Sequence, residues 1–253
     1  MPTNKVALTL LAHPDDAEFL CGGTLLRLRE AGWEVHIASM TPGDCGSMVH
    51  NRWDIASIRT KENAAAAKII CGDAAKYHCM DERDLMVVYD KPAILKCIDL
   101  MRRVNPSLVI THAPRDYMMD HEMTSLLARG ASFGFGAPNI SNVPVPKGAH
   151  VPHLYYCDPV EGIDPLGQQP TLTTWVDVTK QTPKKTKALA AHKSQREWLR
   201  AHHGMDEYLE SMRRQSAMRG KEIGVKYAEA FTQHRGHPYP KDDVLSSLFA
   251  KKS

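Results

Sequence analysis

Short apolar runs alternate with longer stretches of helical periodicity through the first half of the chain. The apolar runs are bounded by polar and turn residues and predict buried strands, whereas the periodic stretches predict helices. Strands are predicted over 6–12, 34–40, 75–79 and 107–113, and helices over 24–31, 53–70 and 92–104. This alternation is typical of an α/β fold with a Rossmann-like, doubly wound and mostly parallel sheet and helices on both faces.

The second half of the chain predicts a C-terminal elaboration of further strands and helices. A loop rich in glycine, proline and asparagine over 134–150, together with the loop over 41–51, is expected to shape a pocket. The predicted elements are a helix over 121–131, strands over 153–157 and 173–178, helices over 182–203 and 205–219, and a strand or extended segment over 225–231. No repeat or linker divides the pattern, so residues 1–253 are expected to form a single domain.

Composition and charge indicate which classes of partner and which compartment to expect. The 253 residues include 32 basic and 29 acidic side chains, and the formal net charge of +3 gives no strong indication of nucleic-acid binding. No apolar run approaches the roughly 20 residues needed to cross a bilayer, so no membrane partner is expected. None of the six cysteines forms a Cys-x-x-Cys pair, and buried free thiols are typical of a reducing compartment. No signal segment precedes the first predicted strand, and we expect a cytoplasmic protein.

Potential metal ligands and acid or base groups follow the first predicted strand directly, at His13, Asp15, Asp16 and Glu18. In open α/β sheets, ligands bind beyond the carboxyl ends of the strands. A spacing of three lets His13 and Asp16 converge on one point if the turn is helical, and both residue types are ligands of catalytic zinc. Asp15 beside them is placed to take a proton from metal-bound water, whose pKa the ion lowers to about 7.

A second cluster of the same kind follows the fourth predicted strand, over 116–121. In a doubly wound sheet that begins at its centre and reverses direction, the first and fourth strands are neighbours, so their loops meet. His121, at the start of a helix, is therefore the predicted third ligand. Asp116 or Asp120 is expected to accept a hydrogen bond from the ring nitrogen of a ligating histidine that does not bind the metal. These ligands predict a zinc site, and a His/His/Asp set suits ferrous iron as well.

Other interpretations of these residues remain open. The turn at Asp15 and Asp16, taken alone, is also typical of a helix cap, and His112 is expected to be a packing residue at the end of its strand. A dinucleotide site is disfavoured, because three carboxylates would repel a pyrophosphate where the first helix begins. A phosphatase with an aspartyl nucleophile gives no function to His13 or His121.

The sequence over 12–18, followed by Gly22-Gly23-Thr24, resembles the opening motif of the PIG-L/LmbE-like zinc-dependent N-acetylglucosaminyl deacetylases. This family includes the bacterial mycothiol- and bacillithiol-pathway deacetylases. The resemblance extends along most of the chain. It covers the loop over 41–44, the helix that carries Arg59 and Glu62, the second cluster over 116–121, and segments over 187–195 and 227–231.

The resemblance implies a function for several residues. His13, Asp16 and His121 would bind zinc, Asp15 would be the general base, and Arg59 and Asp81 would contact the substrate. The family's reaction implies attack of metal-bound water on the N-acetyl group of a small, glucosamine-containing substrate. Glu18, Asp116 and Asp120 are expected to contact the metal ligands without binding the metal themselves. The resemblance also implies a homo-oligomer.

The chain departs from the family's second motif, which usually reads Asp-x-His-Pro-Asp-His. Met118 stands where the family has a histidine that stabilises the tetrahedral intermediate or protonates the leaving amine, and a thioether does neither. Two predictions follow. Either Tyr117 or His192 supplies the missing group, or the protein is a catalytically altered family member that binds metal and acts as a binding protein.

Overall fold

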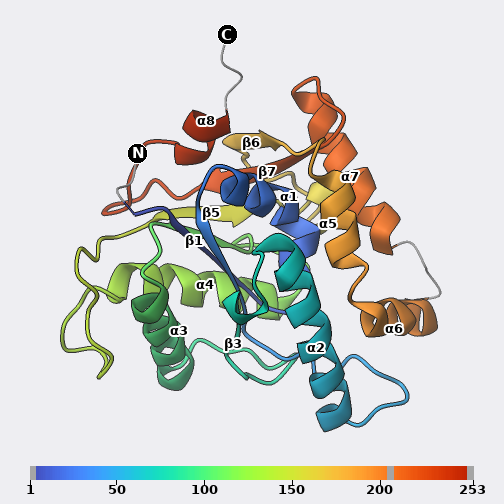
Figure 1. Ribbon diagram of the computed structural model, residues 1–253, viewed down its shortest axis with the longest axis horizontal. Helices are drawn as coiled ribbons and strands as arrows, with labels where there is room; N and C mark the ends of the chain where they lie inside the picture. Colours follow the sequence, from blue (N-terminus) through green and yellow to red (C-terminus); the bar gives the residue numbers. More distant parts are fainter. Residues whose placement is uncertain (1–3, 204–207, 250–253) are drawn as a thin grey trace.

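A mixed seven-stranded sheet in the order β3-β2-β1-β4-β5-β7-β6 runs through the centre of the molecule (Figure 1). The computed structural model describes residues 4–203 and 208–249. The strands are β1 (Val6–Leu11), β2 (Glu34–Ser39), β3 (Tyr77–Cys79), β4 (Leu108–Thr111), β5 (His153–Cys157), β6 (Thr174–Asp177) and β7 (Ala228–Gln233). Strands β1 to β5 are parallel, whereas β7 is antiparallel to β5 and β6. The predicted α/β fold with a C-terminal elaboration is confirmed.

Helices cover both faces of the sheet because both faces of its strands are apolar. In β1, Ala7 and Leu11 belong to one buried cluster, and Leu8 and Leu10 belong to the other. Helices α1, α2, α5 and α8 contribute to the first cluster, and α3 and α4 to the second. The helices are α1 (Asp16–Glu30), α2 (Arg52–Ile70), α3 (Lys91–Val104), α4 (Met119–Gly134), α5 (Thr182–Leu189), α6 (Lys193–His203), α7 (Tyr208–Glu222) and α8 (Val244–Phe249).

Helix α1 begins eight residues earlier than the predicted start at residue 24. The glycine pair Gly22-Gly23, which precedes the predicted start, lies inside the helix, where close packing favours it. A Cβ on Gly23 would lie 2.6 Å from the Cβ of Val178, and one on Gly22 would lie 3.3 Å from Cγ of Lys185. The earlier start places Asp16 and Glu18 in the first turn of α1.

Two predictions for the C-terminal third differ from the structure. The helix predicted over 182–203 is two helices, α5 and α6, separated by 190–192. The last strand begins at Ala228, three residues later than predicted, and 225–227 precede it as turn and loop. The predicted start of the next helix at residue 205 lies outside the described residues, and α7 is described from Tyr208 onward.

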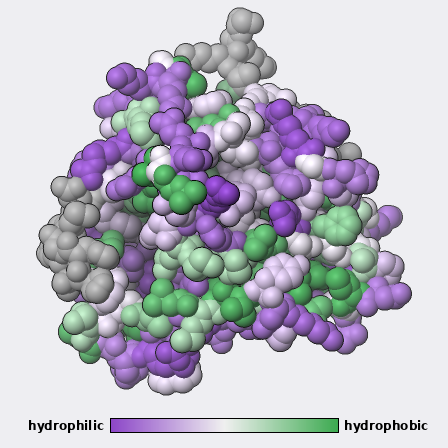
Figure 2. Space-filling model, turned by 180° about the vertical axis from the view of Figure 1, so that it is seen from behind, coloured by the Kyte–Doolittle hydropathy of each residue, from purple (hydrophilic) through white to green (hydrophobic). Residues whose placement is uncertain are grey.

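One face of the molecule carries a band of apolar residues. Figure 2 shows apolar residues gathered across the lower half of the face seen from behind. Exposed large apolar side chains include Met48, Val49, Trp53, Leu85, Met86 and Tyr89. Exposed apolar patches are typical of surfaces that contact another molecule, and the homo-oligomer stays a prediction. Across the described residues, no helix combines the length and apolar character needed to cross a bilayer.

Candidate metal centre

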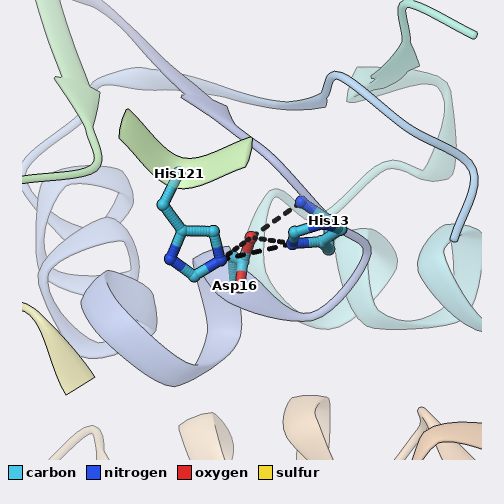
Figure 3. Close-up of side chains that lie close together, drawn as sticks. All are labelled: His13, Asp16 and His121. Carbon is cyan, nitrogen blue, oxygen red and sulfur yellow. Dashed lines mark hydrogen bonds and ion pairs between the residues drawn. The ribbon is translucent and has the colours of Figure 1, made fainter. Parts of the chain in front are cut away.

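The carboxyl ends of β1 and β4 bring the two predicted clusters together. The strands pair in parallel, with Leu10 opposite Thr111. The loop after β1 carries His13 and leads into α1 at Asp16, while the segment after β4 leads into α4, whose first turn carries His121. The three side chains point toward one another from these three positions (Figure 3).

His13, Asp16 and His121 each offer one ligand atom, and these atoms all lie within 4.8 Å of one another. Nδ1 of His13 is 3.2 Å from Nε2 of His121 and 3.4 Å from Oδ2 of Asp16. Oδ2 of Asp16 is 3.7 Å from Nε2 of His121. Two imidazole nitrogens and one carboxylate oxygen converging on a point are a donor set that fits a divalent ion such as zinc.

Carboxylates hold the opposite nitrogens of both imidazoles. Nδ1 of His121 is 3.0 Å from Oδ1 of Asp116. Nε2 of His13 is 3.2 Å from Oδ2 of Asp120 and 3.0 Å from Oδ1 of Asp84. A carboxylate that accepts from one ring nitrogen directs the other nitrogen toward a metal. Asp116 and Asp120 therefore lie where the sequence predicted them, and Asp84 is an additional partner.

Asp84 was missed because its loop has no periodic pattern. Tertiary contacts place the loop: Oδ2 of Asp120 accepts from the backbone N–H of Leu85 at 2.7 Å, and Oδ1 accepts from that of Val87 at 3.1 Å. The same loop directs Asp81 outward, with a φ of 56° and an exposed side chain. Asp84 lines the cavity and Asp81 does not, and a substrate contact of Asp81 stays a prediction.

We expect Asp84→Asn to lower metal affinity about 10- to 100-fold, because the loss of a carboxylate behind a ligating imidazole typically has this effect. Asp81→Asn, the same change at an exposed position of the same loop, is the matched control and should bind metal as the wild type does. Competition titration with a chromophoric chelator measures both affinities. Equal affinities would show that Asp84 does not orient His13.

Asp15 lies beside the ligands and is held by Arg59. Nη2 of Arg59 is 3.3 Å from Oδ2 of Asp15 and donates to the carbonyl oxygen of Pro14 at 2.8 Å. Gly43, with φ of 72°, lets the loop pass close to this guanidinium, since a Cβ there would lie 2.3 Å from Nη1 of Arg59. Burial raises the pKa of Asp15 to about 6, against the lowering effect of Arg59. A carboxylate with this pKa suits proton transfer near neutral pH.

His192 and Glu18 are placed together, but away from the cavity. Both side chains are buried, and Nε2 of His192 is 3.5 Å from Oε2 of Glu18. Neither residue lines the cavity. His192 instead faces Glu18, which lies in the first turn of α1.

Tyr117 and Met118 both line the cavity. The Tyr117 ring makes an edge contact with His121, with centroids 5.2 Å apart. The ordinary pKa of tyrosine is about 10, so the Tyr117 hydroxyl keeps its proton at neutral pH and can donate a hydrogen bond. Of the two replacements predicted for the missing histidine, only Tyr117 reaches the site.

His112 was expected to be a packing residue, and it does pack, against two of the three candidate ligands, His121 and Asp16. Its fully buried ring stacks on His121 with centroids 3.8 Å apart, and its Nε2 is 3.1 Å from Oδ2 of Asp16. Burial and the nearby His121 lower the pKa of His112 to about 4. The ring is therefore neutral at pH 7. The sequence feature that could have placed His112 at the site is its position at the end of β4, beside the loop that leads to His121.

These groups open onto a cavity of about 720 Å³. His13, Asp15, Asp16 and Asp84 lie at its polar end, next to Arg59. The ligand atoms, a carboxylate that can exchange a proton and an enclosed volume are the components of a metal-assisted hydrolytic site.

Comparisons with known proteins identify a family and several similar chains. Residues 8–132 match the family described as "PIG-L: GlcNAc-PI de-N-acetylase". The diacetylchitobiose deacetylase of Thermococcus kodakarensis is 24% identical over 203 residues, covering 76% of this chain and 70% of the relative. The 4-oxalmesaconate hydratase of Pseudomonas putida is 28% identical over 134 residues, covering 50% of this chain and 51% of the relative, so the match spans about half of that protein.

A solved structure extends the likeness to nearly the whole fold. The N,N'-diacetylchitobiose deacetylase from Pyrococcus horikoshii has a TM-score of 0.77 at 24% sequence identity, covering 94% of this chain and 88% of that chain. At this level of identity the likeness shows the fold.

Proposed function

The chain belongs to the PIG-L family through residues 8–132, and from that premise we propose that it is a zinc-dependent amidohydrolase. It removes the N-acetyl group from a small substrate that contains glucosamine. The observation that supports this proposal is the convergence of His13, Asp16 and His121 beside Asp15 at the polar end of one cavity.

The proposed reaction assigns a role to each of these groups. His13, Asp16 and His121 would hold the ion, which when bound supplies Lewis-acid activation of the water and the carbonyl group. Asp15 takes a proton as water adds to the carbonyl carbon. The C–N bond then breaks, and the proton passes from Asp15 to the amine nitrogen, giving an amine and acetic acid, which releases a proton to become acetate. Arg59 holds Asp15 in place throughout, through the contact of 3.3 Å.

Tyr117 is our proposed replacement for the family's histidine at position 118. Its protonated hydroxyl can donate a hydrogen bond to the oxygen on which charge develops during the addition. Met118 beside it contributes an apolar surface. This assignment rests on the place of Tyr117 in the cavity wall and on its contact with His121.

The hydratase relative suggests a second reaction, addition of water to a double bond. A solved hydratase structure of the same fold, from Pseudomonas putida KT2440, is named for 4-carboxy-2-hydroxymuconate, which is a carboxylated compound. Among the described residues that line the present cavity, carboxylates outnumber guanidinium groups, and Arg59 is already paired with Asp15. Such a lining repels carboxylate substrates, so deacetylation is favoured.

We expect protein purified without added metal or chelator to contain about one ion per chain, and His121→Ala to lose it, because a catalytic zinc typically needs all three of its protein ligands. Elemental analysis measures the ion and distinguishes zinc from iron. His50→Ala, at an exposed position, is the matched control and should keep the metal.

Release of a primary amine from N-acetylglucosamine derivatives and loss of absorbance from conjugated carboxylates are the two activity assays. Amine release that follows metal content supports the amidohydrolase. Metal binding without either activity would support the binding-protein alternative, and wild-type protein that takes up no metal after dialysis against zinc would contradict both.

A further inference from the structure

The cavity has a second end that the proposed reaction does not use. Beyond the ligands and Asp15, its wall includes the apolar or aromatic side chains of Phe19 of α1, Val160 and Ile163 after β5, and Trp198 and Leu199 of α6. These five side chains come from three distant parts of the chain, and the polar side chains of Gln195, Tyr208 and Ser211 line the same cavity. A concave apolar surface with a few polar groups at one end is the usual form of a small-molecule site.

The apolar wall is continuous with the polar end. Nη1 of Arg59 and Cδ1 of Trp198 lie 3.4 Å and 3.7 Å from the position that a Cβ on Gly46 would occupy. One glycine therefore separates the guanidinium that holds Asp15 from the aromatic wall. A substituent attached close to the reacting amide would reach Trp198 directly.

The size of the cavity also exceeds what the reacting group needs. Its volume of about 720 Å³ lies in the upper half of the roughly 300–1,000 Å³ typical of sites for drug-sized ligands. An N-acetylated monosaccharide would leave part of the apolar wall facing water. Burial of that wall by an apolar part of the ligand is favourable.

The charges of the lining determine what kind of substituent fits. Glu161 and Asp164 extend the acidic character of the polar end to the loop after β5, and Asp164 also lies 3.7 Å from Arg115. Met118 contributes a thioether to the same lining. Anionic substituents are repelled here, whereas an uncharged hydrocarbon or aromatic group has a matching surface.

We propose that the substrate of this site carries an uncharged apolar group, a hydrocarbon chain or an aromatic ring, joined to the N-acylated amine that reaches His13, Asp15 and Asp16. This inference rests on the proposed amidohydrolase function and names its substrate class. The apolar group has two possible sources, an aglycone on the sugar or a longer N-acyl chain.

Three compounds test the proposal: N-acetylglucosamine, hexyl N-acetyl-β-glucosaminide and N-hexanoylglucosamine. We expect one of the two hexyl compounds to exceed N-acetylglucosamine in kcat/KM by about 60-fold, the effect of three buried methylene groups at about fourfold each. A preference for the glucosaminide identifies an aglycone, and a preference for the amide identifies an acyl chain. Equal kcat/KM for all three compounds would overturn the proposal and leave the deacetylase intact.

Trp198→Ala is expected to lower the ratio of kcat/KM for the preferred hexyl compound to kcat/KM for N-acetylglucosamine by at least about tenfold. Loss of a buried aromatic contact typically has an effect of this size. Trp53→Ala is the matched control, since Trp53 is 70% exposed and does not line the cavity, and it should keep the preference. An unchanged ratio in Trp198→Ala would overturn the proposal that the apolar group of the substrate binds against Trp198.

A binding measurement separates this inference from the proposed function. If none of the three compounds is hydrolysed, the proposed function has failed, and calorimetric titration with hexyl β-glucoside and methyl β-glucoside tests the wall alone. Tighter binding of the hexyl glucoside that is lost in Trp198→Ala supports the proposal. Equal or absent binding of both glucosides contradicts it.

Discussion

Asp15→Asn is expected to reduce kcat about 100- to 10,000-fold, the range that a positioned acid–base group typically contributes. The substitution keeps the size of the side chain but removes its capacity to take a proton. Asp15 is outside the candidate ligand set, so metal content should stay at the wild-type level. Steady-state kinetics of amine release and elemental analysis of the same preparation measure both quantities.

Asp81→Asn is the matched control for this prediction as well. It makes the same chemical change at an exposed position that does not line the cavity, and its kcat should equal that of the wild type. Full turnover by Asp15→Asn on every accepted substrate would contradict the general-base assignment. A loss of metal together with activity would instead show that Asp15 supports the ligands.

The adjacency of the two clusters could be predicted because it follows from topology. Alternating strands and helices specify a sheet in which β1 and β4 are neighbours, and the observed strand order has them side by side. Histidine and carboxylate groups follow both strands. The convergence of His13, Asp16 and His121 could therefore be predicted from the order of the strands alone. The approximate bounds of the strands follow from their apolar runs in the same way.

The residues that differ from prediction depend on contacts between distant segments. Gly22 and Gly23 favour a loop by local propensity, yet packing against Lys185 and Val178 requires them inside α1. His192 belongs to a segment that resembles family motifs near the site, yet it faces Glu18 under α1. The position of Asp84 depends on Asp120. No periodic pattern encodes such contacts, so the sequence alone could not place these side chains.

One buried ion pair helps to connect α1 to the C-terminal third. Nζ of Lys185 is 2.7 Å from Oε1 of Glu229, and both side chains are almost inaccessible to solvent. The two carboxylate oxygens of Glu229 also accept from the backbone N–H groups of Gly23 and Thr24, at 2.8 Å and 2.6 Å. Strand β7 and helix α5 are thereby attached to the helix that begins at Asp16.

Lys185→Met is therefore expected to lower the free energy of unfolding by about 3–5 kcal/mol, because it leaves the Glu229 carboxylate buried without its counter-charge. Urea denaturation followed by circular dichroism measures the change. In the double variant Lys185→Met/Glu229→Gln, the isolated charge is removed while the carboxamide oxygen can still accept from α1. This variant should recover part of the lost stability.

Lys96→Met is the matched control, because the Lys96–Glu82 pair has the same 2.7 Å separation but is partly exposed. Exposed pairs typically contribute about 0–1 kcal/mol, so this variant should unfold nearly as the wild type does. A loss in Lys185→Met no larger than that of Lys96→Met would show that burial adds nothing to the Lys185–Glu229 contact. The attachment of α1 to β7 would then depend on apolar packing in the cluster that includes Cys21, Val178 and Phe231.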